Sequence, residues 1–146
     1  MRMETATRLA AIVAGLCLFT IGAPRAQAQG QAAAKVRIVS PARDTTLKGT
    51  TVTVVLEAKG VEIAPVAEHR AGTAHHHLFL DTEVTPADQP IPVGVAGIVH
   101  LGKGQTTYTF ENVAPGEHRL IAVLGDLNHV PLKPLVADTV RFAIKP

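Results

Sequence analysis

The sequence predicts an all-β protein, a single immunoglobulin-like antiparallel β-sandwich of about seven strands. Short runs rich in valine, isoleucine and threonine alternate with turn residues along most of the chain, which is typical of antiparallel sheets. No segment carries the spacing of a long amphipathic helix. Only three phenylalanines and one tyrosine follow residue 28. We therefore expect a core made mainly of valine, leucine and isoleucine.

The first 28 residues have the features of a cleaved signal peptide. Residues 1–8 carry two arginines, residues 9–23 are almost entirely apolar, and Ala26-Gln27-Ala28 matches the small residues at which signal peptidases cut. The apolar run of about 15 residues is shorter than the roughly 20 that a membrane-spanning helix needs. We predict cleavage after Ala28, export to the periplasm or the medium, and no transmembrane anchor in the mature chain.

Residues 29–34 form a short polar and alanine-rich linker, and residues 35–146 form the one domain that this length allows. The strands that we expect cover residues 36–39, 51–58, 75–81, 97–101, 105–110, 118–124 and 139–144. In the second of these, Val52, Val54 and Leu56 share one face, as in a half-buried strand. The proline-rich residues 85–94 suit neither a central strand nor a helix. We expect a surface loop there.

Turn residues separate the later strands. Gly102-Lys103-Gly104 and Pro115-Gly116 each fit a short turn, and residues 125–134 form a longer loop. His118 takes the place of the aromatic residue that folds back on the chain in a tyrosine corner. The last strand, residues 139–144, alternates apolar and other side chains and closes the sheet.

Composition and residue usage exclude several classes of protein. Residues 1–28 contain three of the 14 basic residues and one of the 12 acidic residues, so the mature chain is formally neutral with eleven of each. It lacks the basic stripe and the stacking aromatics of a nucleic-acid binder. Ser40 is the only serine and Cys17 the only cysteine. Since Cys17 lies in the signal peptide, a hydrolase with a serine or cysteine nucleophile is nearly excluded.

Histidine is the unusual part of the composition, with seven residues that all follow residue 28. Side chains two residues apart in a strand share a face, so His75 and His77 form a pair that can chelate one ion. The candidates for further ligands, if the fold brings them near, are His100, His129 and Asp126. Imidazole binds Zn(II) and Cu(II) at neutral pH, whereas a mature chain without Cys or Met disfavours a Cu(I) carrier or a blue-copper centre.

A second interpretation stays open beside the metal site. The same histidines can brace the fold by hydrogen bonding buried strands and loops, with His76 a core histidine bonded to backbone carbonyls. Geometry distinguishes the two interpretations. Ring nitrogens of His75, His77 and a third residue within about 4 Å of one another favour a metal, because ligand bonds are near 2 Å long. Histidines that point apart favour bracing.

Four runs resemble the bacterial domain-of-unknown-function family 4399. They are residues 74–81 (AHHHLFLD), 100–106 (HLGKGQT), 115–120 (PGEHRL) and 124–131 (LGDLNHVP), within a resemblance that spans residues 72–144. The positions that match the family pattern are His75, His76, His77, His100, His118, Asp126, Asn128, His129 and Pro131. This chain departs from the pattern at Ile98 and Leu132, where many members carry histidine. The resemblance implies a small exported bacterial protein and brings no established activity.

We interpret the sequence as an exported, non-enzymatic binding or accessory module of the periplasm or the cell exterior, with a histidine site for Zn or Cu(II). The alternative is a structural or protein-interaction sandwich of the cell envelope, in which residues 85–94 and the strand edges contact an envelope protein. A metal-dependent enzyme is the least favoured reading. It needs an open coordination position and an acid or base nearby, such as Glu83 or Asp126.

Overall fold

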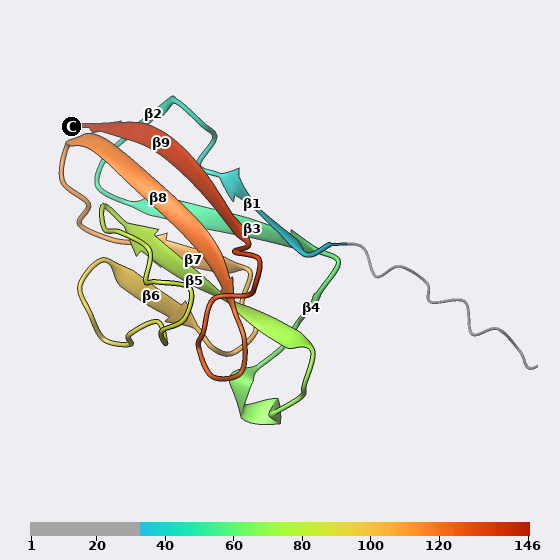
Figure 1. Ribbon diagram of the computed structural model, residues 1–146. Coiled ribbons are helices and arrows are strands. Elements are labelled where there is room, and N and C mark those ends of the chain that lie inside the picture. Colours follow the sequence, from blue (N-terminus) through green and yellow to red (C-terminus); the bar gives the residue numbers. More distant parts are fainter. Residues whose placement is uncertain (1–32) are drawn as a thin grey trace, which may run out of the picture.

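The computed structural model describes residues 33–146 (Figure 1). The predicted signal peptide, residues 1–28, lies outside the described residues, as do residues 29–32 of the predicted linker. Among the described residues, no helix is long and apolar enough to cross a membrane.

The prediction of an all-β sandwich is confirmed. The strands are β1 (Lys35–Ser40), β2 (Thr45–Lys48), β3 (Val52–Lys59), β4 (Glu62–Ile63), β5 (Thr73–Leu80), β6 (Ile98–Leu101), β7 (Thr107–Phe110), β8 (Gly116–Gly125) and β9 (Ala137–Lys145), with one 3-10 turn, η1 (Val66–Glu68). All seven expected strands are present, with ends that differ by a few residues. The two additional strands, β2 and β4, are short.

Two sheets form the sandwich (Figure 1). One has the order β1-β3-β7, and the other has the order β2-β9-β8-β5, with β4 and β6 both paired to the remaining edge of β5. The main pairings are antiparallel, as expected, and two short strands add parallel pairings, β2 to β9 and β4 to β5. The chain leaves β1 at Pro41, which has no N–H for the ladder. It then crosses to the other sheet as β2.

Strand β5 lies between β8 and the short strands β4 and β6 in the larger sheet, and its two faces differ. Ala74 and Leu78 lie in the main core between the sheets, together with valines and leucines of β3 and β8. Phe79 points to the opposite face and packs in a second, smaller core. Because side chains alternate along a strand, His76 faces the main core, whereas His75 and His77 share the outer face with Phe79.

The proline-rich residues 85–94 form a loop without regular structure, as expected. This loop is not simply a surface connection, however. Ile91 is only 2% exposed and packs in the second core against Phe79, Ile121 and Val123. The segment therefore covers part of the outer face of β5 and β8, next to His75 and His77. A single buried isoleucine among prolines gives no periodic signal, which is why the sequence did not predict this contact.

Candidate metal centre

The outer face of β5 and two neighbouring segments bring four histidines together. His75 and His77 come from β5, and His77 lies directly opposite His100 of β6 in the antiparallel pairing. On the other side of β5, His75 lies opposite Gly125, the last residue of β8. The loop that follows Gly125 carries His129 back toward the same place. We refer to His75, His77, His100 and His129 as the histidine cluster.

The ring nitrogens of the histidine cluster converge. The Nε2 atoms of His75 and His77 are 2.9 Å apart, and those of His100 and His129 are 3.2 Å apart. His75, His100 and His129 each offer a nitrogen within 4.8 Å of the others. The 2.9 and 3.2 Å separations are close to the roughly 3.3 Å between ligand atoms of a tetrahedral site with Zn–N bonds of about 2.0 Å. The 4.8 Å limit for His75, His100 and His129 is wider than the roughly 4 Å that two such bonds span, so these rings would have to move closer together around an ion. The six ring-centroid distances, from 4.6 to 5.8 Å, include His77 in the same group.

Two glycines make room for the rings. A Cβ atom on Gly102 would lie 2.5 Å from Nε2 of His100 and still closer to its Cε1. A Cβ atom on Gly125 would lie 2.9 Å from Nε2 of His77. Neither glycine has a positive φ, so glycine at these positions provides space and not backbone freedom. Sequence reasoning assigned Gly102 to a turn and missed this role.

Asp126 differs from the other predicted ligands, because its carboxylate is hydrogen bonded to the backbone of its own turn. Its Oδ1 atom accepts hydrogen bonds from the backbone N–H groups of Asn128 (2.8 Å) and Val130 (3.0 Å). The N–H of His129 donates to the backbone carbonyl of Asp126 at 2.9 Å. His129 itself adopts a left-handed conformation with φ 63°, which costs energy for a residue other than glycine. Asp126 thus organises the turn that presents His129.

Burial favours the neutral form of three members of the histidine cluster, His75, His77 and His100. Desolvation, followed by the proximity of His100 and His129, lowers the pKa of His75 to about 4. Desolvation and the neighbouring histidines lower the pKa of His77 to about 2, and desolvation and His129 also lower the pKa of His100. Neutral imidazole is the form that binds metal ions, so near pH 7 protons compete weakly for these nitrogens.

The surroundings of His75 and His77 do not supply hydrogen-bond partners for all the ring nitrogens of two metal-free imidazoles. Their Nε2 atoms can be hydrogen bonded only when one of the two carries the proton. The Nδ1 atom of His77 is buried and has no hydrogen-bond partner among the described residues. Buried polar groups are usually hydrogen bonded, and an unpaired one lowers stability. Nε2 of His76 is likewise buried without a partner among the described residues, so an unpaired nitrogen alone does not distinguish the histidine cluster from His76.

Two other histidines brace the fold. His76 is fully buried, and its Nδ1–H donates to the backbone carbonyl of Gln105 at 3.2 Å. His118 donates from Nδ1 to a carboxylate oxygen of Asp81 (2.7 Å) and from Nε2 to the carbonyl of Ala114 (2.8 Å). This second bond folds the ring back toward the preceding turn, as expected for a corner residue. Its ring also stacks on Phe142.

The His118 contacts predict a pH-dependent stability. Desolvation alone would lower the pKa of His118, but the hydrogen bonds to Asp81 and Ala114 outweigh it and raise the pKa. The added stability is therefore complete below the unfolded pKa of about 6.5 and is lost as pH rises through the higher folded pKa.

The lowered pKa values of His75, His77 and His100 make stability rise with pH up to about 6.5, so the His118 effect is read as the difference between the unsubstituted protein and Asp81→Asn. In urea unfolding between pH 5 and 9, this difference should shrink as pH rises through the folded pKa of His118. A profile that Asp81→Asn leaves unchanged would contradict this account.

The proline-rich loop is tied to the histidine cluster through its backbone. The N–H of Ile91 donates to the carbonyl of His129 at 2.8 Å. Pro90 and Pro92 have no backbone N–H, so Ile91 supplies the only backbone N–H donor of residues 90–92. The buried Ile91 side chain fixes the position of that donor. Ile91 therefore helps to hold His129 in place, a role for which the sequence offered no signal.

We expect Ile91→Pro to weaken ion binding by about tenfold, the lower end of the effect of losing an outer partner of a metal ligand. The substitution removes the donor to His129 and part of the buried side chain. Ile91→Val keeps the donor and is the matched control. Equal affinities of the two variants in calorimetric titration would contradict a positioning role for the Ile91 N–H.

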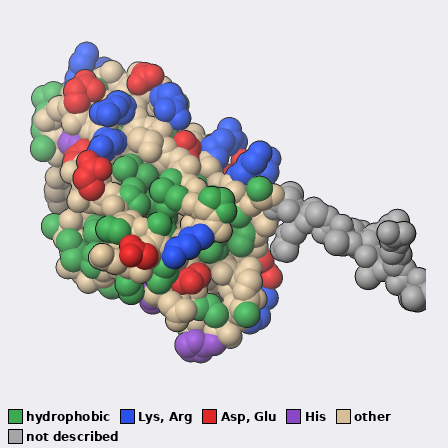
Figure 2. All heavy atoms as spheres, in the orientation of Figure 1, with side chains coloured by type: hydrophobic (Ala, Val, Ile, Leu, Met, Phe, Trp, Pro, Cys, Tyr) green, Lys and Arg blue, Asp and Glu red, His purple; other side chains and the backbone are tan. Residues whose placement is uncertain are grey.

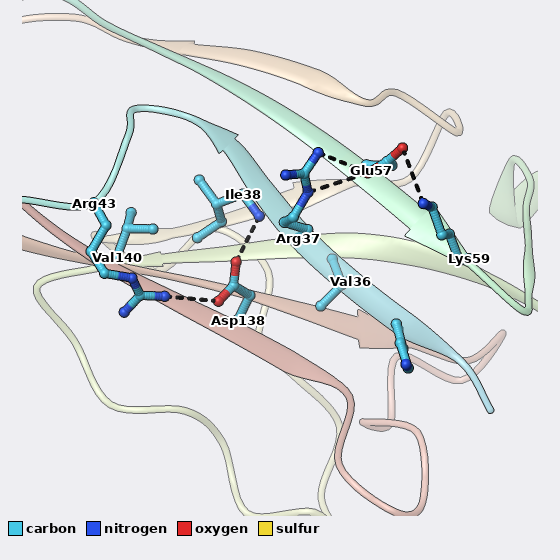
Figure 3. Close-up of a pocket in the computed structure, with 9 residues that line it drawn as sticks. Val36, Arg37, Ile38, Arg43, Glu57, Lys59, Asp138 and Val140 are labelled. Atoms are coloured by element: carbon cyan, nitrogen blue, oxygen red, sulfur yellow. Dashed lines mark hydrogen bonds and ion pairs between the residues drawn. The ribbon is translucent and has the colours of Figure 1, made fainter.

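A hollow in the described part of the chain lies elsewhere, between β1 and β9 (Figure 3). It encloses about 800 Å³ and is open to solvent. Most of its charged groups pair with one another, as in Arg37–Glu57 at 3.1 Å and Arg43–Asp138 at 3.5 Å. Figure 2 shows basic and acidic side chains intermingled on the visible face near β1 and β2. No unpaired polar side chains converge there as they do in the histidine cluster.

The chain belongs to the family described as Domain of unknown function (DUF4399), whose profile matches residues 54–145. This match confirms the resemblance identified from the sequence. No curated protein matches the chain significantly. The family assignment gives the chain its relatives but no activity.

Solved structures show only distant similarity. An engineered protein is 13% identical with a TM-score of 0.49, over 80% of this chain and 21% of its own length. A protein described as the extracellular domain of a one component system of B. thetaiotaomicron is 12% identical with a TM-score of 0.41, over 71% of this chain and 12% of its own length. The chain thus spans a small part of each. Likeness at this level carries no functional argument.

Proposed function

We propose that this protein is an exported binding module that holds one divalent ion, Zn(II) or Cu(II), in the histidine cluster. The convergence of ring nitrogens from β5, β6 and the loop after β8 carries the proposal. The ligand set would be His75, His100 and His129, with His77 beside them as a fourth nitrogen. Asp126 would position His129 and place a negative charge near the ion.

The chemistry of the ligands limits the choice of ion. All four are neutral nitrogens, and the described residues contain neither Cys nor Met. Imidazole suits ions of borderline softness, and affinity for such a site increases from Zn(II) to Cu(II). Export is supported by the signal-peptide pattern of residues 1–28. We therefore expect the protein to bind either ion and to prefer Cu(II).

The alternative, a structural or protein-interaction module with bracing histidines, is favoured by His76 and His118. Both of these make hydrogen bonds to the backbone. The histidine cluster differs, because its side-chain hydrogen bonds within the described part of the chain join one histidine to another. Bracing accounts for His76 and His118, and ion binding accounts better for the other four.

Calorimetric titration of Zn(II) and Cu(II) into the protein, purified without a polyhistidine tag, tests this proposal. We expect one ion per chain and a loss of affinity of at least about a hundredfold in His129→Asn, since losing a ligand costs more than losing its outer partner. His69→Asn is the matched control, because His69 also has a left-handed backbone, with φ 49°. Asparagine tolerates that conformation. Equal binding by both variants would contradict the proposal.

A further inference from the structure

Strand β1 has one edge that pairs with no other strand in the described part of the chain. It lies at the end of the smaller sheet and pairs only with β3. Its other edge faces the hollow of about 800 Å³, and the opposite wall is the half of β9 that β2 leaves uncovered (Figure 3). The backbone N–H of Ile38 points into this gap, because it donates to a carboxylate oxygen of Asp138 at 2.8 Å. Residues two apart in a strand direct their backbone groups to the same side, so those of Val36 point there too.

The two faces of β1 differ in chemistry along this edge. Val36 and Ile38 are buried and line the hollow together with Val140 of β9. Lys35 and Arg37 alternate with them and are exposed on the outer face, and Figure 3 shows Arg37 and Val36 on opposite sides of the strand. A strand added to this edge would therefore place every second side chain against apolar surface and the others beside the basic residues.

The hollow carries an excess of positive charge. Its lining includes four basic residues and two acidic ones (Lys35, Arg37, Arg43 and Lys59 against Glu57 and Asp138). The strand register places Lys35 opposite Lys59, and like charges directly opposite one another destabilise a sheet. Glu57 serves both Arg37 at 3.1 Å and Lys59 at 3.8 Å, and Lys35 adds a third cation. A carboxylate from outside the chain would relieve this repulsion.

We propose that the edge of β1 binds an extended segment of another protein in which apolar and acidic residues alternate, an inference that goes beyond the proposed function. The segment adds to β1 as a further strand of the smaller sheet. Its apolar side chains cover Val36 and Val140, and its carboxylates lie beside Lys35 and Arg37. In this mode of recognition the main-chain hydrogen bonds supply affinity, and the alternate side chains supply specificity. The carboxylate of Asp138 holds the N–H of Ile38 until the segment displaces it.

The alternative is that the charged residues only protect this edge, since many proteins use charged side chains to keep other strands from an unpaired edge. The two interpretations differ in what Asp138→Ala does. If the edge binds a segment, removing this carboxylate frees the N–H of Ile38 and removes a negative charge. We then expect binding at least about threefold tighter, a gain that a misfolded protein cannot produce.

Fluorescence anisotropy with a dye-labelled, end-blocked peptide of alternating valine and glutamate tests this inference. EDTA in the buffer keeps the test independent of ion binding at the histidine cluster. We expect affinity that falls as salt rises and that is at least about fivefold lower in Lys35→Glu. Lys145→Glu is the matched control, because Lys145 lies opposite Lys48 in the pairing of β2 with β9 and does not line the hollow. A peptide of the same composition with its valines grouped together should bind more weakly, because it cannot alternate its side chains between two faces.

Val36→Pro tests the backbone contact. The N–H of Val36 points away from β3, so proline spares that ladder and removes a donor from the free edge. We expect it to weaken peptide binding at least about tenfold. Failure of the alternating peptide to bind, or binding that Asp138→Ala and Val36→Pro both leave unchanged, would overturn the inference. Self-association in sedimentation that Val36→Pro abolishes would also overturn it, because the edge would then hold a second copy of this chain.

Discussion

Replacing Gly102 by alanine is expected to reduce ion affinity by at least about a hundredfold while the chain still folds, an effect comparable to losing a ligand. The three atoms nearest to the new Cβ all belong to the His100 ring. That ring would have to leave its place. The backbone itself tolerates alanine, because Gly102 has no positive φ. Calorimetric titration with Zn(II) and Cu(II) gives the affinity, and far-ultraviolet circular dichroism checks the fold.

A double-mutant cycle isolates the cause of this effect. If Gly102→Ala acts only by displacing His100, it should have no further effect on affinity in a chain that already carries His100→Ala. Additive losses would mean that Gly102 acts on the fold and not on the ligand. Full affinity in Gly102→Ala alone would mean that the His100 ring is not a ligand.

Replacing both His75 and His77 by leucine is expected to abolish ion binding and to stabilise the metal-free protein. The two rings are buried, bonded only to each other at Nε2, and leave Nδ1 of His77 unpaired. Replacing both partners of a buried polar pair by apolar groups of similar volume is neutral or stabilising. We expect a gain of about 1 kcal/mol, within the range of such substitutions. Urea unfolding in the presence of EDTA measures it.

This prediction separates the two interpretations of the histidines most sharply. If His75 and His77 brace the fold, the double leucine variant loses stability. If they form a site, stability rises as binding is lost. His76→Leu is the comparison within the same strand, because His76 donates to Gln105 and its loss leaves that partly buried carbonyl without this donor. We expect His76→Leu to destabilise the protein, in contrast to the double variant.

The architecture could be predicted from the sequence because most strands carry apolar alternation. The eight residues of β3 show this pattern clearly. The strands that the sequence did not predict, β2 and β4, have four and two residues. They are too short and too polar for periodicity to indicate them. They pair because the neighbouring edges of β9 and β5 are available, which is a property of the assembled sheets.

The candidate site could be predicted only in part. The sharing of one face by His75 and His77 follows from strand geometry alone. The approach of His100 depends on the register between β5 and β6, and that of His129 on a loop that Asp126 organises. The local sequence determines neither this strand register nor the path of this loop. The space left by Gly102 and Gly125 follows from ring positions, so it could be recognised only once the fold was known.

Anomalous X-ray diffraction from crystals of the ion-loaded protein tests the central claim most directly. Data collected at the zinc or copper absorption edge locate the ion without reference to any assumed ligand. The account predicts one strong peak per chain, about 2 Å from the Nε2 atoms of His75, His100 and His129. A peak at surface carboxylates with none at the histidine cluster, or ordered rings around no peak at all, would contradict it.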